Sequence, residues 1–286
     1  MNGIIDSGTI RRGLVVLGAG GPVGLGVVEA AVEAGHGVVA VGMDEDARRA
    51  LIDRLPQARI RAVPGSIASD ADAAALAALL RDSGMTIDGV VASLTGAHPC
   101  GRLIDEPAEV LQRTLDQDLL PHLFAARHLL PLLADDGAGY VLVGGPGGRY
   151  PWAGYGHCSI AAAALRMMAR VLHDEAGRQG QRVQLLSMDA PLGDAVAALA
   201  LGRRALAMLA AARHACPAPI LDYAGAMTSG VIAIDPPAGA SSAIRRGRRA
   251  APASEVLPAR DLRAARALLD AIAFPTSPGH PHDERC

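Results

Sequence analysis

Short apolar segments alternate with amphipathic segments of helical period along most of this chain. Residues 13–44 contain an apolar stretch, a glycine loop, an amphipathic stretch and a second apolar stretch, which predicts a βαβ unit. Further strands are predicted at 58–67 (with its exit loop), 87–96, 138–145, 181–188 and 229–235. Helices are predicted at 70–84, 107–137, 159–177 and 194–215. This alternation favours a parallel sheet covered on both faces by helices.

We therefore expect residues 11–237 to form one α/β domain of the Rossmann type, a doubly wound, seven-stranded parallel sheet with helices on both faces. Pro121 lies inside the predicted helix 107–137 and should perturb it, because the proline ring removes a backbone donor. Residues 238–286 form a C-terminal extension, for which the sequence predicts a linker, a short helix and a flexible tail.

Composition narrows the class of partner. The chain has 286 residues, of which 50% are hydrophobic, and this is ample for a buried core. A net charge of -2 gives no electrostatic reason to expect nucleic acid or an anionic membrane as a partner, so we expect a small molecule. The four cysteines are scattered, and neither a signal peptide nor a membrane-spanning segment is evident, which predicts a cytoplasmic protein.

A glycine loop follows the first predicted strand. Gly18, Gly21 and Gly24 form G-x-x-G-x-x-G where the first helix begins. Glycine permits a tight turn and a close approach to a pyrophosphate, and the helix N-terminus offers unpaired N–H groups to its charge. The loop predicts a site for NAD(P), or descent from a protein with such a site.

The end of the second strand leaves the choice of dinucleotide open. An acidic residue that binds the ribose is expected there, but Gly42 occupies the position. Asp44 could take this role after a shift of the loop, or it could cap the helix that follows. No arginine follows the strand immediately to bind a 2′-phosphate.

The order of these segments resembles that of the short-chain dehydrogenase/reductase superfamily. The resemblance rests on the glycine loop and on the segments "IDGVVASLTG", "LDQDLLPHLFAARHLLPLL", "GYVLVGG", "AAAALRMMARVLHDE" and "TSGVIAID" at the family's spacing. It implies the fold given above, a dinucleotide cofactor, and a homodimer or homotetramer formed by long helices. Ser66 stands where the family has an aspartate that contacts adenine.

The same resemblance implies that the catalytic residues are lost. Relatives use an Asn, a Ser, a Tyr and a Lys, the lysine lowering the pKa of the tyrosine that exchanges a proton with substrate. At those positions this chain has Asp118, Gly145, Cys158 and Ala162, respectively. The chain contains no lysine at all, so no shift of the alignment restores the pair.

An aromatic loop lies next to the vacated site. Of seven aromatic residues in the chain, Tyr150, Trp152 and Tyr155 fall within one short segment. Aromatic rings in a concave site offer broad apolar area with a polar tip, so the loop predicts a hydrophobic small-molecule ligand, although filling the core is the alternative. Arg149 could bind an anionic group of that ligand.

Several residues could replace the missing acid/base chemistry. His157 is the first candidate, because imidazole exchanges protons near neutral pH without help from a cation. Tyr155 is a second proton donor, and Cys158 could act as a nucleophile or be a small buried replacement for tyrosine. Asp118 and His122 are one helical turn apart and could face the cleft as a pair.

Metal binding is not expected. His98 with Cys100, and His280 and His282 with Cys286, resemble fragments of metal sites. Neither group supplies four ligands at the spacing of a structural zinc site.

Three functions remain open on the sequence. The first is a non-redox enzyme, for example a cyclase, dehydratase or isomerase, acting on a hydrophobic and natural-product-like molecule without requiring the dinucleotide. The second is an NAD(P)H-dependent oxidoreductase with a substitute proton donor. The third is a non-catalytic subunit or sensor with the same fold.

Overall fold

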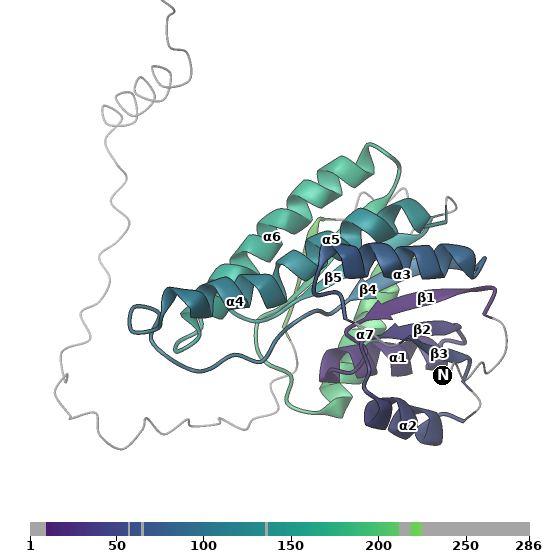
Figure 1. Cartoon of the computed structure of the whole chain (residues 1–286), viewed down its shortest axis with the longest axis horizontal. Coiled ribbons are helices and arrows are strands. Elements are labelled where there is room, and N and C mark those ends of the chain that lie inside the picture. The colour runs from purple at the N-terminus through teal and green to yellow at the C-terminus, as the bar shows by residue number, and fades with distance from the viewer. Residues whose placement is uncertain (1–9, 57, 64–65, 135–136, 212–217, 225–286) are drawn as a thin grey trace, which may run out of the picture. The chain divides into compact units, whose positions relative to one another are not determined.

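The computed structural model describes residues 10–56, 58–63, 66–134, 137–211 and 218–224 (Figure 1). In this part of the chain the strands form one parallel sheet of seven strands in the order β3-β2-β1-β4-β5-β6-β7. The strands are β1 (Arg12–Leu17), β2 (Val38–Val41), β3 (Ile60–Val63), β4 (Thr86–Ala92), β5 (Gly139–Gly144), β6 (Arg182–Met188) and β7 (Ile220–Tyr223). The predicted doubly wound α/β fold is confirmed.

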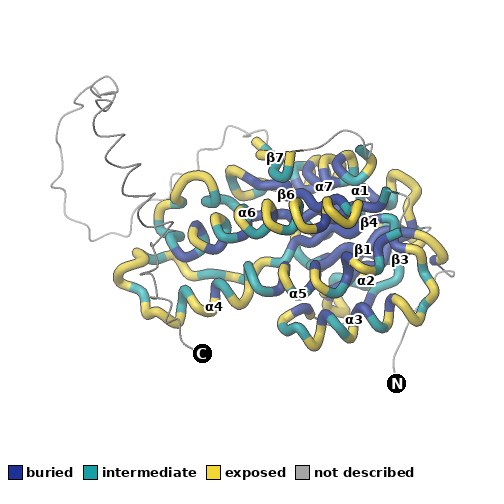
Figure 2. The backbone as a smooth tube through the Cα atoms, turned by 90° about the horizontal axis from the view of Figure 1, so that it is seen from above, coloured by how far each residue is buried: buried dark blue, intermediate teal, exposed yellow. Residues whose placement is uncertain are grey.

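Helices cover both faces of the sheet (Figures 1 and 2). One face carries α3 (Asp70–Asp82), α4 (Ala108–Asp118), α5 (Leu120–Leu129) and α6 (Gly156–Gly177), and the other carries α1 (Pro22–Glu33), α2 (Glu45–Arg54) and α7 (Ala195–Ala210). Val15 and Leu17 of β1 pack into the first face, and Leu14 and Val16 pack into the second. This alternation explains why the strands read as continuous apolar runs. No helix in the described ranges is both long and apolar enough to cross a bilayer.

The seventh strand of the described sheet lies earlier in the chain than the sequence predicts. Strand β7 is Ile220–Tyr223, which pairs with β6 from Leu185↔Ile220 to Met188↔Tyr223, whereas the sequence placed a strand at 229–235. Strand β7 is a short edge strand that includes Asp222, so it lacks the apolar run that marks the other strands. Residues 229–235 and the predicted C-terminal extension at 238–286 lie outside the described residues.

The expected effect of Pro121 on the long helix is confirmed. Helix α4 ends at Asp118, α5 begins at Leu120, and Leu119 between them has φ -115° and ψ -58°. Pro121 lies in the first turn of α5, where its missing N–H costs little. The break directs the two halves of the predicted helix along different axes.

Helices α1 and α7 approach each other closely through two glycines. A Cβ atom added at Gly202 would lie 2.3 Å from the Gly26 carbonyl oxygen, and one added at Gly26 would lie 2.3 Å from the Ala198 carbonyl. Only glycine allows such backbone contact. Helix α7 therefore supports the helix whose N-terminus follows the glycine loop.

Candidate functional site

The glycine loop lines a cavity of about 380 Å³ at the carboxyl end of β1. Gly18 has φ +71°, and a Cβ atom there would lie 1.9 Å from the Ser93 carbonyl oxygen. Gly24 packs against the loop itself, because an added Cβ would lie 2.1 Å from the Gly18 oxygen. Gly21 is the N-cap of α1 and supplies no side-chain cap, so first-turn N–H groups remain available to an anion. A tight glycine turn and a helix N-terminus with unpaired N–H groups are the features that pyrophosphate sites of this fold use.

At the end of β2 this cavity lacks the acidic residue that commonly binds a ribose. Gly42, with φ +83°, lines the cavity at the end of β2. The Asp44 side chain accepts a hydrogen bond of 2.7 Å from the Ala47 N–H and caps α2. Ser66 also lines the cavity. The residues thus fit the pyrophosphate of a dinucleotide, while Asp44 serves the helix and not the cavity.

A second cavity of about 240 Å³ continues from the first, and Leu94, Thr95 and Gly96 line both. All four positions that correspond to the family's catalytic residues line it: Asp118, Gly145, Cys158 and Ala162. Its other walls are mainly apolar and come from Trp152, Leu165, Met188, Pro146 and Pro191, with His98 at one side. The cavity has room for the reacting part of a small apolar molecule.

An aspartate–histidine pair forms the polar wall of this second cavity. The His98 Nε2–H donates to the Asp118 carboxylate over 2.8 Å, and the Gly96 N–H donates to the same carboxylate over 2.7 Å. The two side chains are only 10% and 15% exposed, respectively. Because Asp118 engages Nε2, Nδ1 carries the free lone pair of the imidazole, with Thr114 Oγ1 at 3.5 Å. The Thr114 hydroxyl already donates to the Val110 carbonyl over 2.8 Å.

Two loops hold His98 over the start of α6. The Gly101 N–H donates to the Gly154 carbonyl over 2.8 Å and joins the loop after β4 to the aromatic loop. The Ser159 hydroxyl accepts a hydrogen bond of 2.9 Å from the Trp152 N–H and donates to the Tyr155 carbonyl over 3.1 Å. These contacts fix the aromatic loop on the first turn of α6.

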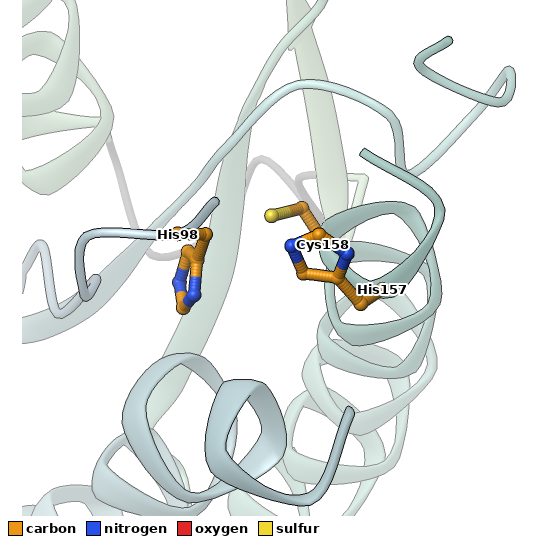
Figure 3. Close-up of side chains that lie close together, drawn as sticks. All are labelled: His98, His157 and Cys158. Atoms are coloured by element: carbon orange, nitrogen blue, oxygen red, sulfur yellow. The ribbon is translucent and has the colours of Figure 1, made fainter. Parts of the chain in front are cut away.

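His157 and Cys158 occupy that first turn and face His98 (Figure 3). The His157 ring is 0% exposed, and neither of its nitrogens has a hydrogen-bond partner within the described residues. Its ring centroid lies 5.8 Å from that of His98 in an edge-to-face arrangement. One ring nitrogen of each histidine and the Cys158 sulfur lie within 4.8 Å of one another. Two unpaired buried nitrogens are costly, and His157 is not among the residues that line the two cavities.

Cys158 and Tyr155 are the other chemical candidates in this loop. Burial, and then the nearby Asp118 carboxylate, raise the pKa of the Cys158 thiol to about 11, so it stays protonated at neutral pH. Cys100, burial and Cys158 raise the pKa of Tyr155 above its ordinary value. Tyr155 stacks on Trp152 at 4.2 Å, and Trp152 is the aromatic residue of this loop that lines the cavity.

The remaining predicted site residues lie elsewhere. His122 is fully buried, its Nε2–H donates to the Leu94 carbonyl over 3.1 Å, and burial lowers its pKa to about 4. Asp118 therefore pairs with His98 rather than with His122. Tyr150 is 69% exposed, and Arg149 lies over its ring at 5.3 Å and pairs with Asp222 at 3.4 Å. Neither residue lines the two cavities.

From the sequence, His98 is not predicted as a residue of this cavity. It is considered only together with Cys100, as a fragment of a metal site. The available signal was its position shortly after a central parallel strand, β4, whose carboxyl end faces the crevice. Polar residues in such loops commonly contact ligands.

Comparisons with known proteins agree with this fold. Residues 18–218 match a family model described as enoyl-(acyl carrier protein) reductase, a family of short-chain dehydrogenases/reductases. No curated protein sequence matches the chain.

Three solved structures with the same fold have low sequence identity to this chain. A short-chain type dehydrogenase/reductase from Mycobacterium ulcerans is 21% identical with TM-score 0.57, covering 62% of this chain and 66% of its own, just under two thirds. A short-chain dehydrogenase from Streptomyces avermitilis is 20% identical with TM-score 0.64, covering 77% and 89%. An NADPH-bound short-chain oxidoreductase from Pseudomonas aeruginosa PAO1 with an atypical catalytic centre is 20% identical with TM-score 0.65, covering 76% and 97%. At these identities the likeness shows the fold alone.

Proposed function

Because the chain belongs to the short-chain dehydrogenase/reductase superfamily, we propose that it is an enzyme that transfers protons on a hydrophobic small molecule. The observation that carries this proposal is the Asp118–His98 pair, joined at 2.8 Å on the wall of a largely apolar cavity. A carboxylate that holds one ring nitrogen fixes the tautomer and leaves the other to accept a proton. His98 is the proposed acid/base, and Asp118 orients it.

The proposed reaction is a non-redox one, such as a cyclisation, dehydration or isomerisation. These reactions require a positioned acid/base and a shaped apolar pocket, and no hydride donor. The usual tyrosine depends on a lysine cation, which this chain lacks, whereas imidazole does not. Trp152, Leu165 and Met188 supply the apolar contact for a natural-product-like substrate.

A second candidate is an NAD(P)H-dependent reductase, favoured by the continuity of the two cavities. Leu94, Thr95 and Gly96 line both, so a dinucleotide on the glycine loop would extend toward His98. The bound cofactor would supply the hydride, and His98 would supply the proton. The NADPH-bound Pseudomonas aeruginosa protein with its atypical catalytic centre supports this alternative by analogy.

Cofactor dependence and mutagenesis together test the proposal. The full chain, freed of nucleotide, is incubated with a lipophilic metabolite extract, with and without NADH or NADPH, and products are identified by mass spectrometry. We expect turnover without cofactor, reduced about 10²–10⁴-fold in His98→Gln and Asp118→Asn. Cys100→Ser is the matched control, because Cys100 is exposed and does not line the second cavity. Turnover that requires NAD(P)H would favour the reductase, and unchanged turnover in His98→Gln would reject the assignment of His98.

We also propose a homodimer or homotetramer that uses the outer face of α5 and α6. Leu123, Ile160, Met167 and Val171 are between 39% and 58% exposed. The last three are separated by seven and four positions, so they share one side of α6. Apolar side chains gathered on one helix face are typical of an interface between subunits.

A further inference from the structure

We propose that His98, His157 and Cys158 form a binding site for a soft divalent transition metal, of which Zn²⁺ is the best match. The three side chains come from two separate segments, the loop after β4 and the first turn of α6, and they face a common space (Figure 3). Their candidate ligand atoms, two imidazole nitrogens and a sulfur, all lie within 4.8 Å of one another. Nitrogen and sulfur are the ligands that zinc prefers in proteins.

The buried His157 ring is an independent reason to place a ligand here. Both of its nitrogens are unpaired within the described residues although the side chain is 0% exposed. Burying an imidazole without partners is unfavourable, and a bound ion would satisfy one nitrogen directly. Coordination requires the three ligand atoms to close to about 2.0–2.3 Å from the ion.

Asp118 holds the other ring nitrogen of His98. Its carboxylate accepts the Nε2–H over 2.8 Å, and the Gly96 N–H fixes its orientation over 2.7 Å. A histidine that binds a metal commonly donates its other ring N–H to a carboxylate, which raises its basicity and sets the tautomer. Asp118 is therefore a positioning residue for the metal, and Nδ1 of His98 is the ligand atom.

The three-ligand set leaves a position open toward the second cavity, which His98 and Cys158 line. Zinc sites with three protein ligands and one open position bind water or a substrate oxygen there. On binding, the S–H bond of Cys158 breaks, its proton passes to solvent, and the sulfur donates an electron pair to the ion. The ligand for the open position is an oxygen atom of a small molecule, such as a carbonyl or hydroxyl.

This site goes beyond the proposed function, because an ion on Nδ1 of His98 would occupy the lone pair that the proposed proton transfer uses. The metal-loaded protein would polarise a substrate oxygen through the ion instead. Metal binding can be tested without a substrate. Failure to bind metal would leave the proton-transfer role of His98 and Asp118 intact. If the protein turns over substrate without binding metal and His98→Gln does not, the proton-transfer proposal stands and the metal proposal fails.

Cobalt serves as the spectroscopic probe of the full chain. To exclude other thiols, Cys100, Cys216 and Cys286 are replaced by serine, which leaves Cys158 as the sole cysteine. After chelation and dialysis, Co²⁺ is titrated, and we expect one equivalent to give a thiolate-to-cobalt charge-transfer band that Zn²⁺ abolishes. In this background, His98→Gln and His157→Gln should lose the band, and Asp118→Asn should keep it with about 10–100-fold weaker affinity. Circular dichroism checks that each variant is folded.

Alkylation provides a test that needs no variant. The wild-type chain is treated with iodoacetamide with and without Zn²⁺, and the labelling of Cys158 and Cys100 is compared by peptide mass spectrometry. We expect Zn²⁺ to slow labelling of Cys158 at least tenfold and to leave the exposed Cys100 unchanged. The proposal is overturned if the sole-cysteine chain gives no charge-transfer band, if His98→Gln gives the wild-type band, or if Zn²⁺ protects the two cysteines equally.

Discussion

Acid should destabilise this protein through His122. In the folded chain this side chain is completely buried, its one hydrogen bond is to the Leu94 carbonyl, and burial lowers its pKa from 6.5 to about 4. Below pH 6.5 the unfolded chain binds a proton at this residue that the folded chain does not yet bind. Its contribution to stability is therefore complete above pH 6.5 and is lost as the pH falls from 6.5 to about 4.

The size of this loss follows from the two pKa values. The whole difference corresponds to about 3 kcal/mol, and about 2 kcal/mol of it is lost by pH 5. Urea unfolding at about pH 7.5 and pH 5 gives the free energy of unfolding at each pH. Comparing the change in wild type with that in His122→Gln isolates His122 from the other histidines, since glutamine can still donate to Leu94 but does not titrate.

His36→Gln is the matched control, because His36 is exposed on the loop before β2. We expect this variant to lose as much stability as the wild type between the two pH values. His122→Gln should lose about 2 kcal/mol less. Equal losses in wild type and His122→Gln would refute the reasoning, because they would mean that His122 gains its proton at the same pH in both states.

Other perturbations test the packing, the glycine loop and the interface. Gly202→Ala should destabilise the fold by about 1–3 kcal/mol in urea unfolding, because its Cβ would lie 2.3 Å from a backbone oxygen of α1, whereas Gly177→Ala, with nothing within 4 Å, should be neutral or stabilising. A wild-type unfolding midpoint in Gly202→Ala would contradict the close contact. Gly18→Ala should weaken NADPH binding, measured by fluorescence, at least tenfold, because the residue has φ +71° and faces Ser93; equal affinity would argue against a dinucleotide on this loop. Met167→Glu should convert a dimer or tetramer to smaller species in light scattering, since this side chain is 58% exposed on α6; an unchanged mass would place the interface elsewhere.

The sequence predicts most of the sheet because each buried strand carries an apolar run of its own. Strands β5 and β6 are buried at every position, so their signal is strong and local. Strand β7 has four residues at an edge, including the exposed Asp222, and depends on pairing with β6 rather than on its own pattern. Pairing between distant segments leaves no periodic trace in a single sequence.

In the site, too, local features could be predicted from the sequence, whereas contacts between distant segments could not. The glycine loop is local, and two of its glycines have the backbone roles that the spacing indicates: Gly18 has φ +71°, and Gly24 packs against the Gly18 oxygen. The expected Asp118–His122 pair assumed a continuous helix, but the helix breaks at Leu119, so the two residues belong to different helices. Asp118 meets His98 instead, and this contact depends on how the loop after β4 folds across α4. The pattern of apolar and polar residues in the sequence does not indicate how this loop crosses the helix.

The contact between Gly26 and Gly202 has a consequence for the order of folding. Helix α1, which follows the glycine loop, lies near the beginning of the chain, whereas α7, which packs against it, lies more than 160 residues later. We expect contacts between such distant segments to form late, because closing the intervening loop costs entropy. A nascent chain that stops before α7 would expose the small-residue face of α1, so the cavity beside the glycine loop should gain its support only after α7 has left the ribosome.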